Sequence, residues 1–503
     1  MKRFLSFVAM AMLCMGAFAQ PSLPKFRSGE MNKGFDYLMA HNSRIITCQG
    51  GELLIATWET RSFLGAFMPW GLQVVAVDTN MNVLRQVKLP DTRMSELVFA
   101  NYVDGKVYLL YREQFIAVYH RAVIEPQSMT IESCEAMKEN AQGKDVNAYH
   151  WNAKSGNGLF YGVEDVFVNS VSGEMVHRQI LFDEKMETLW EKRFEANEVS
   201  NLKVTDDGEM ILFGSRYDKD SRETVVAVHV LDVDDEKSVV ERVAIGEVHR
   251  LSLLNVVGSS ESPTRYAVAA GYIRTPDSPK KRDCFDQMVG LSLNLRSGEL
   301  KAKAVRFTSD ELNVFGNKGL KKENKVGMAD ALVMVGSAET GYGGVLMLQR
   351  VWKVTTHSTK NPDVHTYYTM GSLAMAVDTT GTILWHKPFR TVNAERTGQG
   401  NDIPCYGDAP MIGEGDNVYV MLPEQSKTTD TYDITQPALN VALGNRAHSF
   451  VVYGIDRQGD VVKQVLLQKD KASLMNNIVR QAPGRYLGIY AFHKKSALVY
   501  VNF

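Results

Sequence analysis

A short stretch between positions 357 and 369 has the composition of a recognition surface. It contains five side chains that are suited to binding: His357, Asp363, His365, Tyr367 and Tyr368. Aromatic rings pack against sugars or peptide side chains, while carboxylate and imidazole groups supply the hydrogen bonds that fix a ligand's orientation. We predict that these residues bind a ligand. The alternative is a solvated loop that binds nothing.

The spacing of candidate ligands predicts no metal and no cofactor. His357 and His365 match no recurrent metal-binding pattern. Asp218, Asp220 and Glu223 are spaced like part of a calcium loop, but the segment lacks the glycine and the full length of one, so we expect a hairpin turn there. Nucleophile elbows, phosphate-binding loops and His-Glu-x-x-His motifs are missing from the sequence. A pair of carboxylates from distant segments would escape such a search, so an enzyme stays open.

The element that would position these residues is a repeated hairpin, clearest in Gly371–Arg390. Its first half, Leu373–Val377, is continuously apolar, which is typical of a strand that is covered on both faces. Asp378 and Gly381 then form a turn, because the aspartate accepts backbone hydrogen bonds and glycine tolerates a positive φ. The second half carries Trp385 and ends near a proline, as in an outer strand.

Versions of this hairpin recur along the whole chain and predict an all-β fold. The repeating units are Tyr37–Pro90, Ser95–Met137, Ala148–Ala196, Asn201–Gly246, His249–Phe307, Ala329–Thr391, Tyr406–Lys469 and Ser473–Phe503. Self-similarity with such a period is the mark of a propeller or solenoid. We predict a β-propeller of eight blades. Seven blades is the alternative, because insertions in units six and seven blur the register.

The last unit has only three strands, so we expect the N-terminal segment to supply the fourth. Part of Pro21–Phe35 would then close the ring and leave no free sheet edge. The predicted organisation is a leader over 1–19, a closing segment over 20–36 and one propeller domain over 37–503. Long loops are expected within 309–447, and loops on a rigid scaffold are where binding surfaces usually lie. These loops are Ser309–Lys325, His357–Thr369, Val392–Ile403 and Glu424–His448.

The segment Ala376–Trp385 resembles the Ala-x-Asp, Thr-Gly and Trp repeat of propellers of the pyrroloquinoline-quinone type. A second unit shares it in part through Asp183 and Trp190, and the other units keep only a polar residue at the turn. That group includes eight-bladed quinoprotein dehydrogenases and non-enzymatic outer-membrane assembly scaffolds. The chain also resembles exported propeller-like proteins of unknown function from Bacteroidota. A quinone cofactor would need a calcium site and a base in the central funnel, and no such set can be placed here.

The first twenty residues have the pattern of a secretory signal peptide. Lys2 and Arg3 precede an apolar stretch, and the small residues Ala17 and Ala19 predict cleavage after Ala19. Cys14 lacks the preceding small residue of a lipoprotein signal, so no lipid anchor is expected. We predict a periplasmic or extracellular protein without a membrane span once the leader is removed.

The cysteines leave the disulfide question open. Four remain after the leader, Cys48, Cys134, Cys284 and Cys405, and they are far apart. Export permits disulfides, and four cysteines allow three pairings; one bridge or unpaired core residues are both compatible with this count.

The charge balance excludes some partners. The chain has 56 basic and 58 acidic residues, which gives nothing to attract nucleic acid. We therefore predict a monomeric, non-catalytic binding or scaffold propeller that recognises a protein or glycan through its loops. The alternative function is a carbohydrate-active hydrolase or lyase with its site in the central funnel.

Overall fold

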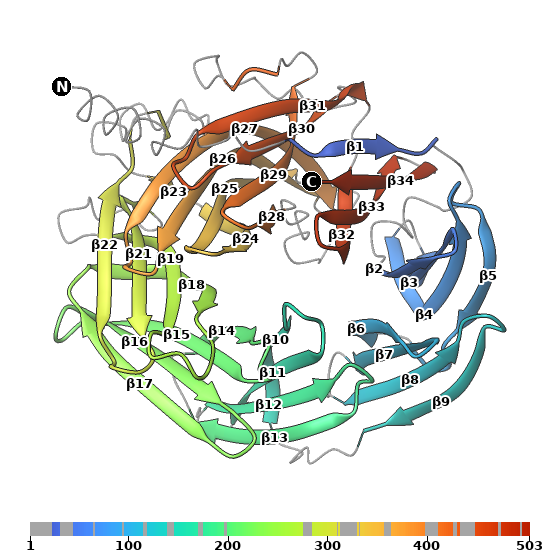
Figure 1. Ribbon diagram of the computed structural model, residues 1–503, viewed down its shortest axis with the longest axis horizontal. Coiled ribbons are helices and arrows are strands. Elements are labelled where there is room, and N and C mark those ends of the chain that lie inside the picture. Colours follow the sequence, from blue (N-terminus) through green and yellow to red (C-terminus); the bar gives the residue numbers. More distant parts are fainter. Residues whose placement is uncertain are drawn as a thin grey trace, which may run out of the picture.

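The computed structural model shows a ring of small antiparallel sheets (Figure 1). The residues that it describes are 23–30, 44–63, 66–92, 95–113, 118–137, 145–169, 175–195, 199–274, 284–308, 310–311, 329–330, 332–356, 364–397, 411–425, 430–432, 448–470, 474–492 and 495–503. Eight four-stranded sheets follow one another around the ring, so the fold is an eight-bladed β-propeller, as predicted.

The first four blades use consecutive strands of the N-terminal half. They are β2 (Arg44–Gln49), β3 (Glu52–Phe63), β4 (Ala66–Asp78) and β5 (Val83–Lys88); β6 (Ser95–Val103), β7 (Lys106–Glu113), β8 (Tyr119–Glu125) and β9 (Thr130–Ala136); β10 (Asp145–Lys154), β11 (Phe160–Asn169), β12 (Met175–Asp183) and β13 (Thr188–Glu195); β14 (Val199–Val204), β15 (Met210–Asp218), β16 (Glu223–Leu231) and β17 (Glu236–Val243). In each of these four blades, the chain runs from the strand nearest the centre of the ring to the strand on its outside (Figure 1).

Blades five to eight continue the ring. They are β18 (Glu247–Val257), β19 (Tyr266–Arg274), β21 (Gln287–Asn294) and β22 (Leu300–Arg306); β24 (Leu332–Thr340), β25 (Gly343–Thr356), β26 (Val364–Asp378) and β27 (Ile383–Thr397); β28 (Met411–Glu414), β29 (Asn417–Gln425), β30 (His448–Ile455) and β31 (Val461–Asp470); β32 (Leu474–Ala482), β33 (Arg485–Phe492), β34 (Lys495–Asn502) and β1 (Lys25–Ser28). Two short strands, β20 (Cys284–Phe285) and β23 (Ala329–Asp330), pair separately.

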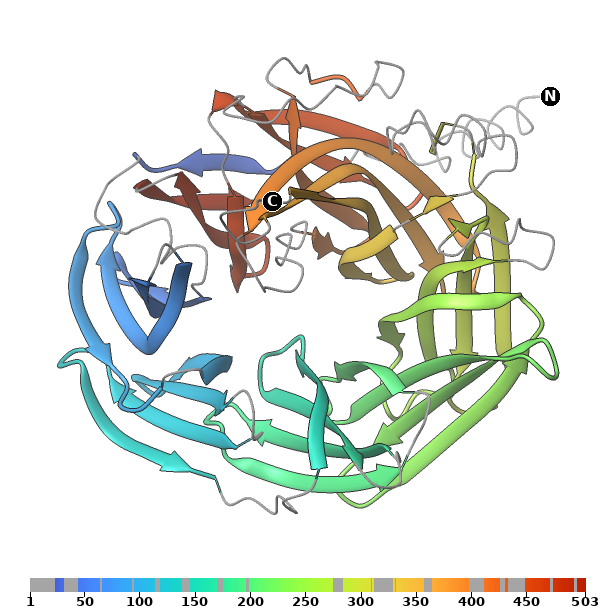
Figure 2. The ribbon, with the colours of Figure 1, turned by 180° about the vertical axis from the view of Figure 1, so that it is seen from behind.

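The two ends of the chain meet in the last blade, as the sequence predicted. Strand β1 pairs antiparallel with β34, with Lys25 opposite Asn502 and Ser28 opposite Val499. Both views of the ring show β1 on the outside of this blade (Figures 1 and 2). Because the fourth strand comes from the opposite terminus, hydrogen bonds hold the ring closed at this seam.

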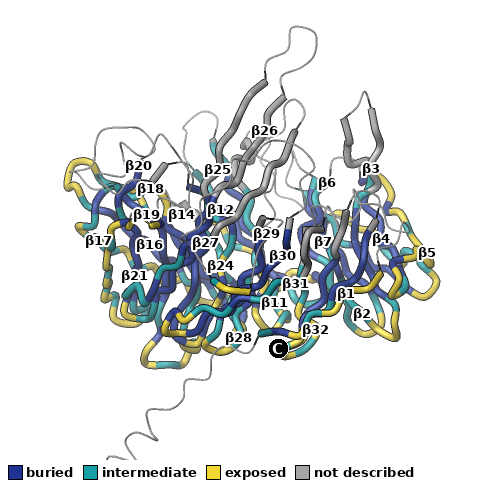
Figure 3. Tube along the Cα trace, turned by 90° about the horizontal axis from the view of Figure 1, so that it is seen from above, coloured by how far each residue is buried: buried dark blue, intermediate teal, exposed yellow. Residues whose placement is uncertain are grey.

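Each interface between neighbouring blades has its own apolar cluster. Strand β26 shows how one strand serves two interfaces: Leu373, Met375 and Val377 pack toward blade five, whereas Ala374 and Ala376 pack toward blade seven. Alternate residues of a strand point to opposite faces of its sheet. The continuous apolar runs are therefore explained by burial on both faces, and Figure 3 shows buried strands through the body of the ring.

The predicted aspartate turn recurs between the third and fourth strands of several blades. Asp378 Oδ1 accepts hydrogen bonds from the backbone N–H groups of Thr380 at 2.8 Å and Thr382 at 3.0 Å. Asp78, Asp183 and Asp456 accept the equivalent pair of bonds in their own turns. The turn is thus a property of the repeat, since a carboxylate at this place satisfies two backbone donors.

The third residue after each of these aspartates has a left-handed backbone. It is Met81 or Met186 in two blades and Gly381 or Gly459 in two others, with φ between 60° and 84°. A Cβ at Gly459 would lie 2.8 Å from Trp385 of the preceding blade, so Trp385 occupies the space that a side chain would need. Both methionines are fully buried. In two blades the turn residue thus buries its own methionine side chain, whereas at Gly459 a tryptophan of the preceding blade lies where that side chain would be.

Among the described residues, no helix is both long and apolar enough to cross a membrane.

The calcium-like spacing at Asp218 forms a hairpin turn, as predicted. Asp218 Oδ1 accepts from the backbone N–H of Asp220 at 3.0 Å, and Oδ2 accepts from Arg242 at 2.8 Å.

Candidate functional site

The predicted recognition residues lie in and next to the longest hairpin of blade six. His365, Tyr367 and Tyr368 belong to strand β26, and His357 and Asp363 lie outside the described residues. The prediction of a loop from His357 to Thr369 is therefore wrong for its second half. That half is rich in threonine, tyrosine and valine, which favour strands, and it pairs with equally strand-prone segments on both sides.

A second expected loop is also strand in part. The segment predicted as a loop from Val392 to Ile403 continues β27 as far as Thr397. Strands β25, β26 and β27 have 14, 15 and 15 residues, whereas the strands of the neighbouring blade seven have at most 10. We call the added three-stranded part, residues 350–356, 364–370 and 392–397, the blade-six arm.

The register of the arm sorts its residues onto two faces. Tyr367 lies directly opposite Lys353 on one side and Glu395 on the other, so these three residues share a face with His365. Successive positions of a strand alternate between the two faces of its sheet, so the position of Tyr368 is on the other face, with its register partners Trp352 and Ala394. The structure thus places His365 and Tyr367 on one face and Tyr368 on the opposite one.

A bulge marks the point where the arm leaves the blade. The pairing shifts by one residue between Met370 and Ser372, and Gly371 between them has φ 72°. A bulged residue with a positive φ bends a strand and is most easily a glycine. Gly371 therefore separates the packed part of blade six from the arm.

The described side chains form their best-defined polar cluster elsewhere, between blades two and three. His150 and Asp165 are direct neighbours in the register of β10 and β11, and their Nδ1 and Oδ1 atoms are 3.1 Å apart. Tyr119 of blade two donates its hydroxyl to Asp165 Oδ2 at 2.8 Å. Arg112 lies 3.4 Å from Asp165 Oδ1. We call these four residues the Asp165 network.

The surroundings of Asp165 keep it ionised. Burial by itself would raise the pKa of this carboxyl, but the hydrogen bond from His150 and the charges of His150, Arg112 and Arg178 together lower it. Burial and the nearby Asp165 charge raise the pKa of Tyr119, so this phenol stays protonated and donates. The network consists of one anion held by several donors.

The preceding residue, Glu164, faces the opposite interface of the same blade. Its Oε1 atom lies 2.7 Å from His177 Nδ1 and 3.5 Å from Gln179 Nε2. Burial is the dominant influence here and raises the pKa of Glu164, while the hydrogen bond to His177 opposes it. The pKa values of two adjacent carboxyls thus shift in opposite directions. The charges of Arg112 and Arg178 help to lower the pKa of Asp165, whereas burial dominates at Glu164.

The burial of this cluster determines what it can do. Tyr119 is 1% exposed and Asp165 is completely buried, so no substrate reaches their polar atoms in this conformation. The arrangement instead ties blades two and three together through paired charges. Sequence reasoning missed it, although Glu164 and Asp165 inside an otherwise apolar strand are a usable signal, since a buried acid needs partners.

The described residues also bear on metals and disulfides. No group of three or more histidine, cysteine, aspartate or glutamate side chains among them is arranged to hold a metal ion. Cys48 and Cys134 are free thiols, which excludes a bridge between them. Cys405 lies outside the described residues.

Comparison with known proteins finds likeness to solved structures at low sequence identity. No family model and no curated protein matches the sequence. Among solved structures, the chain is similar to the Dos1 propeller, with 8% identity over 95% of both chains and a TM-score of 0.39. It is also similar to the polysaccharide lyase Uly1 (9% identity, 96% of this chain and 99% of that one, TM-score 0.33) and to Drosophila Semaphorin 1b (7%, 96% and 87%, 0.31).

The eight four-stranded sheets themselves make the chain an eight-bladed β-propeller. At such low identity and TM-score, the likeness to these structures supports no statement about function. The expected pyrroloquinoline-quinone type and the resemblance to Bacteroidota proteins gain no support from a matching family or relative.

Proposed function

We propose that the protein is an exported binding propeller that recognises a protein or glycan through the blade-six arm. The observation that carries this proposal is the joint extension of β25, β26 and β27 beyond the bulge at Gly371. A rigid ring that carries an ordered extra sheet is a common way to present a recognition surface.

The composition of one arm face supports a polar ligand. Lys353, His365, Tyr367 and Glu395 share that face, so it combines an aromatic ring, an imidazole and both signs of charge. Residues of these types form hydrogen bonds with the hydroxyl groups of a sugar or the backbone of a peptide, so they favour a polar ligand over an apolar one. The proposal keeps His365 and Tyr367 as ligand-binding residues and assigns no catalytic step to them.

The test compares the native chain with a variant in which Lys353, His365, Tyr367 and Glu395 are replaced by alanine. Both proteins are applied to a glycan array and to an array of extracellular protein fragments. The control replaces four exposed residues at and just before the start of the outer strand β17, Asp234, Asp235, Glu236 and Lys237, with alanine. We expect a ligand that binds the native chain and the control but not the arm variant. Equal binding by all three would contradict the proposal.

Export is part of the proposal and has its own test. The leader over 1–19 predicts a mature chain that begins at Gln20. N-terminal sequencing of protein recovered from the periplasm or the medium measures this directly. A chain that retains Met1 and stays in the cytoplasm would contradict it.

A further inference from the structure

A cavity of about 850 Å³ lies at the seam where the ring closes. It is lined by residues of β1 and of the last blade, together with Cys48 of β2 in blade one. Small-molecule sites commonly have volumes of this order, about 300 to 1,000 Å³. The cavity is therefore large enough for a ligand, and it belongs to the only blade built from both ends of the chain.

The cavity opens on the side of the ring opposite the blade-six arm. Its lining includes Gly484, in the turn between the first and second strands of its blade, and Asn502, at the end of the third strand. The arm, by contrast, extends the hairpin between the second and third strands of blade six. Successive strands are antiparallel, so these two kinds of strand end lie on opposite faces of the propeller. A ligand in the cavity would not compete with one on the arm.

The wall of the cavity is apolar and aromatic. Leu487 and Tyr486 are buried, and Phe503 packs edge-on against Tyr486 with ring centroids 5.5 Å apart. Tyr486 donates its hydroxyl to Glu414 of blade seven, so the polar end of this ring already has a partner. A flat apolar body would replace water against this wall at a gain in free energy.

The charge of the lining is positive. Lys25 and Arg485 are exposed at the cavity and have no ion-pair partner in the part of the chain that the structure describes. None of the described side chains that line the cavity is acidic. Burial raises the pKa of the Cys48 thiol, and burial together with the nearby Cys48 raises the pKa of Tyr500. The Cys48 thiol and the Tyr500 phenol are therefore neutral at pH 7. Lys25 and Arg485 are the ionised side chains among the described residues of the lining.

We infer that the seam cavity binds a small anionic ligand with an aromatic or otherwise apolar body. The apolar wall takes the body, and Lys25 and Arg485 attract the anionic group. Because Lys25 comes from β1 and Arg485 from β33, such a ligand contacts both termini of the chain at once. Its binding therefore favours the closed ring over any state in which β1 has detached.

The first experiment titrates the mature chain with 8-anilinonaphthalene-1-sulfonate, an aromatic sulfonate whose fluorescence rises on binding. We expect one saturable site and an upward shift of the melting temperature, which separates binding to the folded ring from binding to a loosened one. Lys25→Glu and Arg485→Glu should each weaken binding about tenfold, because each replaces attraction with repulsion. Lys219→Glu, at an exposed turn of blade four, should leave it unchanged.

The neutral analogue N-phenyl-1-naphthylamine tests the requirement for an anion. It has the same aromatic body without the sulfonate, and its binding should be weaker and insensitive to Lys25→Glu and Arg485→Glu. Equal affinity for the two dyes, or no response of the sulfonate to either charge reversal, would overturn the inference.

A second measurement needs no variant. Cys48 lines the cavity, whereas Cys134 is exposed in blade two, so the same chain carries a reporter and a control. We expect the sulfonate to slow the reaction of Cys48 with N-ethylmaleimide and to leave the rate at Cys134 unchanged. Equal rates at Cys48 with and without the sulfonate would place the dye elsewhere and refute the site.

Discussion

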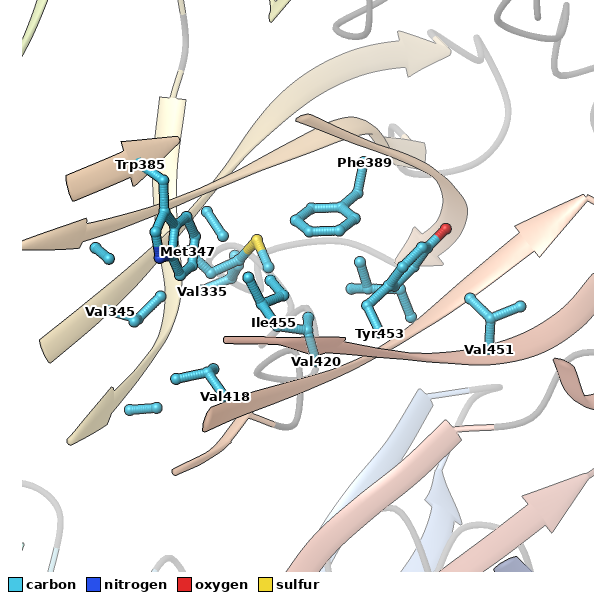
Figure 4. Packing of buried hydrophobic residues seen from close by; sticks show 14 of the residues in the cluster. Val335, Val345, Met347, Trp385, Phe389, Val418, Val420, Val451, Tyr453 and Ile455 are labelled. Atoms are coloured by element: carbon cyan, nitrogen blue, oxygen red, sulfur yellow. The ribbon is translucent and has the colours of Figure 1, made fainter. Parts of the chain in front are cut away.

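The interface between blades two and three and the interface between blades six and seven solve the same packing problem differently. Blades six and seven meet through an apolar cluster that includes Trp385, Phe389 and Tyr453 (Figure 4). The buried ion pair beside it, Glu424 with Lys463, lies within blade seven and does not cross the interface. Blades two and three have an apolar cluster as well, but it is continued by the Asp165 network. An apolar contact tolerates small rearrangements, whereas a buried charge requires each of its partners. Substitutions at the interface between blades two and three should therefore lower the unfolding free energy more than substitutions at the interface between blades six and seven.

The largest effect is expected from Asp165→Ala. This change removes the anion, leaves His150 buried without its counter-charge and leaves Arg112 with the partly exposed Glu96. Breaking a buried pair in this way typically costs about 3 to 5 kcal/mol of unfolding free energy. Chemical denaturation measures the loss. Asp235→Ala, which breaks an exposed pair with Lys237, is the control and should cost less than about 1 kcal/mol. Similar losses for the two variants would remove the proposed contrast.

A smaller effect is expected at the apolar interface from Gly459→Ala. Its backbone has φ 84°, and the new Cβ would lie 2.8 Å from Trp385. Gly415→Ala is the matched control, because Gly415 also has a positive φ of 60° but an added Cβ meets nothing within 4 Å. The control should lose about 1 kcal/mol from the left-handed backbone alone, and Gly459→Ala about 1 to 3 kcal/mol more from overpacking. Equal losses would mean that Trp385 moves away without cost.

The smallest effects concern pH and distinguish the two adjacent carboxyls of blade three. The folded pKa of Asp165 is below its ordinary value of 3.8, so its ionised form stabilises the fold above that pH, and the contribution is lost as the pH falls through the folded pKa. The folded pKa of Glu164 is above 4.5, so its protonated form stabilises the fold below that pH, and this contribution is lost as the pH rises through the folded pKa.

Two conservative variants separate these contributions. In Asp165→Asn, the unfolding free energy should fall less steeply than in the native chain as the pH drops below 3.8. In Glu164→Gln, the unfolding free energy should instead fall less steeply as the pH rises above 4.5. Unfolding free energies measured between pH 3 and pH 8 check both directions. Slopes of the same sign for the two sites would show that His177 governs Glu164 as strongly as the arginines govern Asp165.

The arm shows where prediction from the sequence failed. The expected loop His357–Thr369 is strand from Val364 onward, where polar residues interrupt the apolar pattern of the repeat. The arm segments pair as strands, but they lack the continuous apolar run that identifies an enclosed blade strand. The pattern therefore detects enclosed strands and misses a sheet that extends past the ring.

The sequence by itself determined the repeat, the number of blades, the aspartate turns and the closure by β1, because these depend on local patterns that each unit carries within itself. The tertiary structure alone decided which side chains meet across the interfaces. Tyr119 reaches Asp165 over 46 positions and Gly459 meets Trp385 over 74, and the seam cavity joins Lys25 to Arg485 from opposite ends of the chain. Such contacts follow from how the blades tilt against one another, which no single unit encodes.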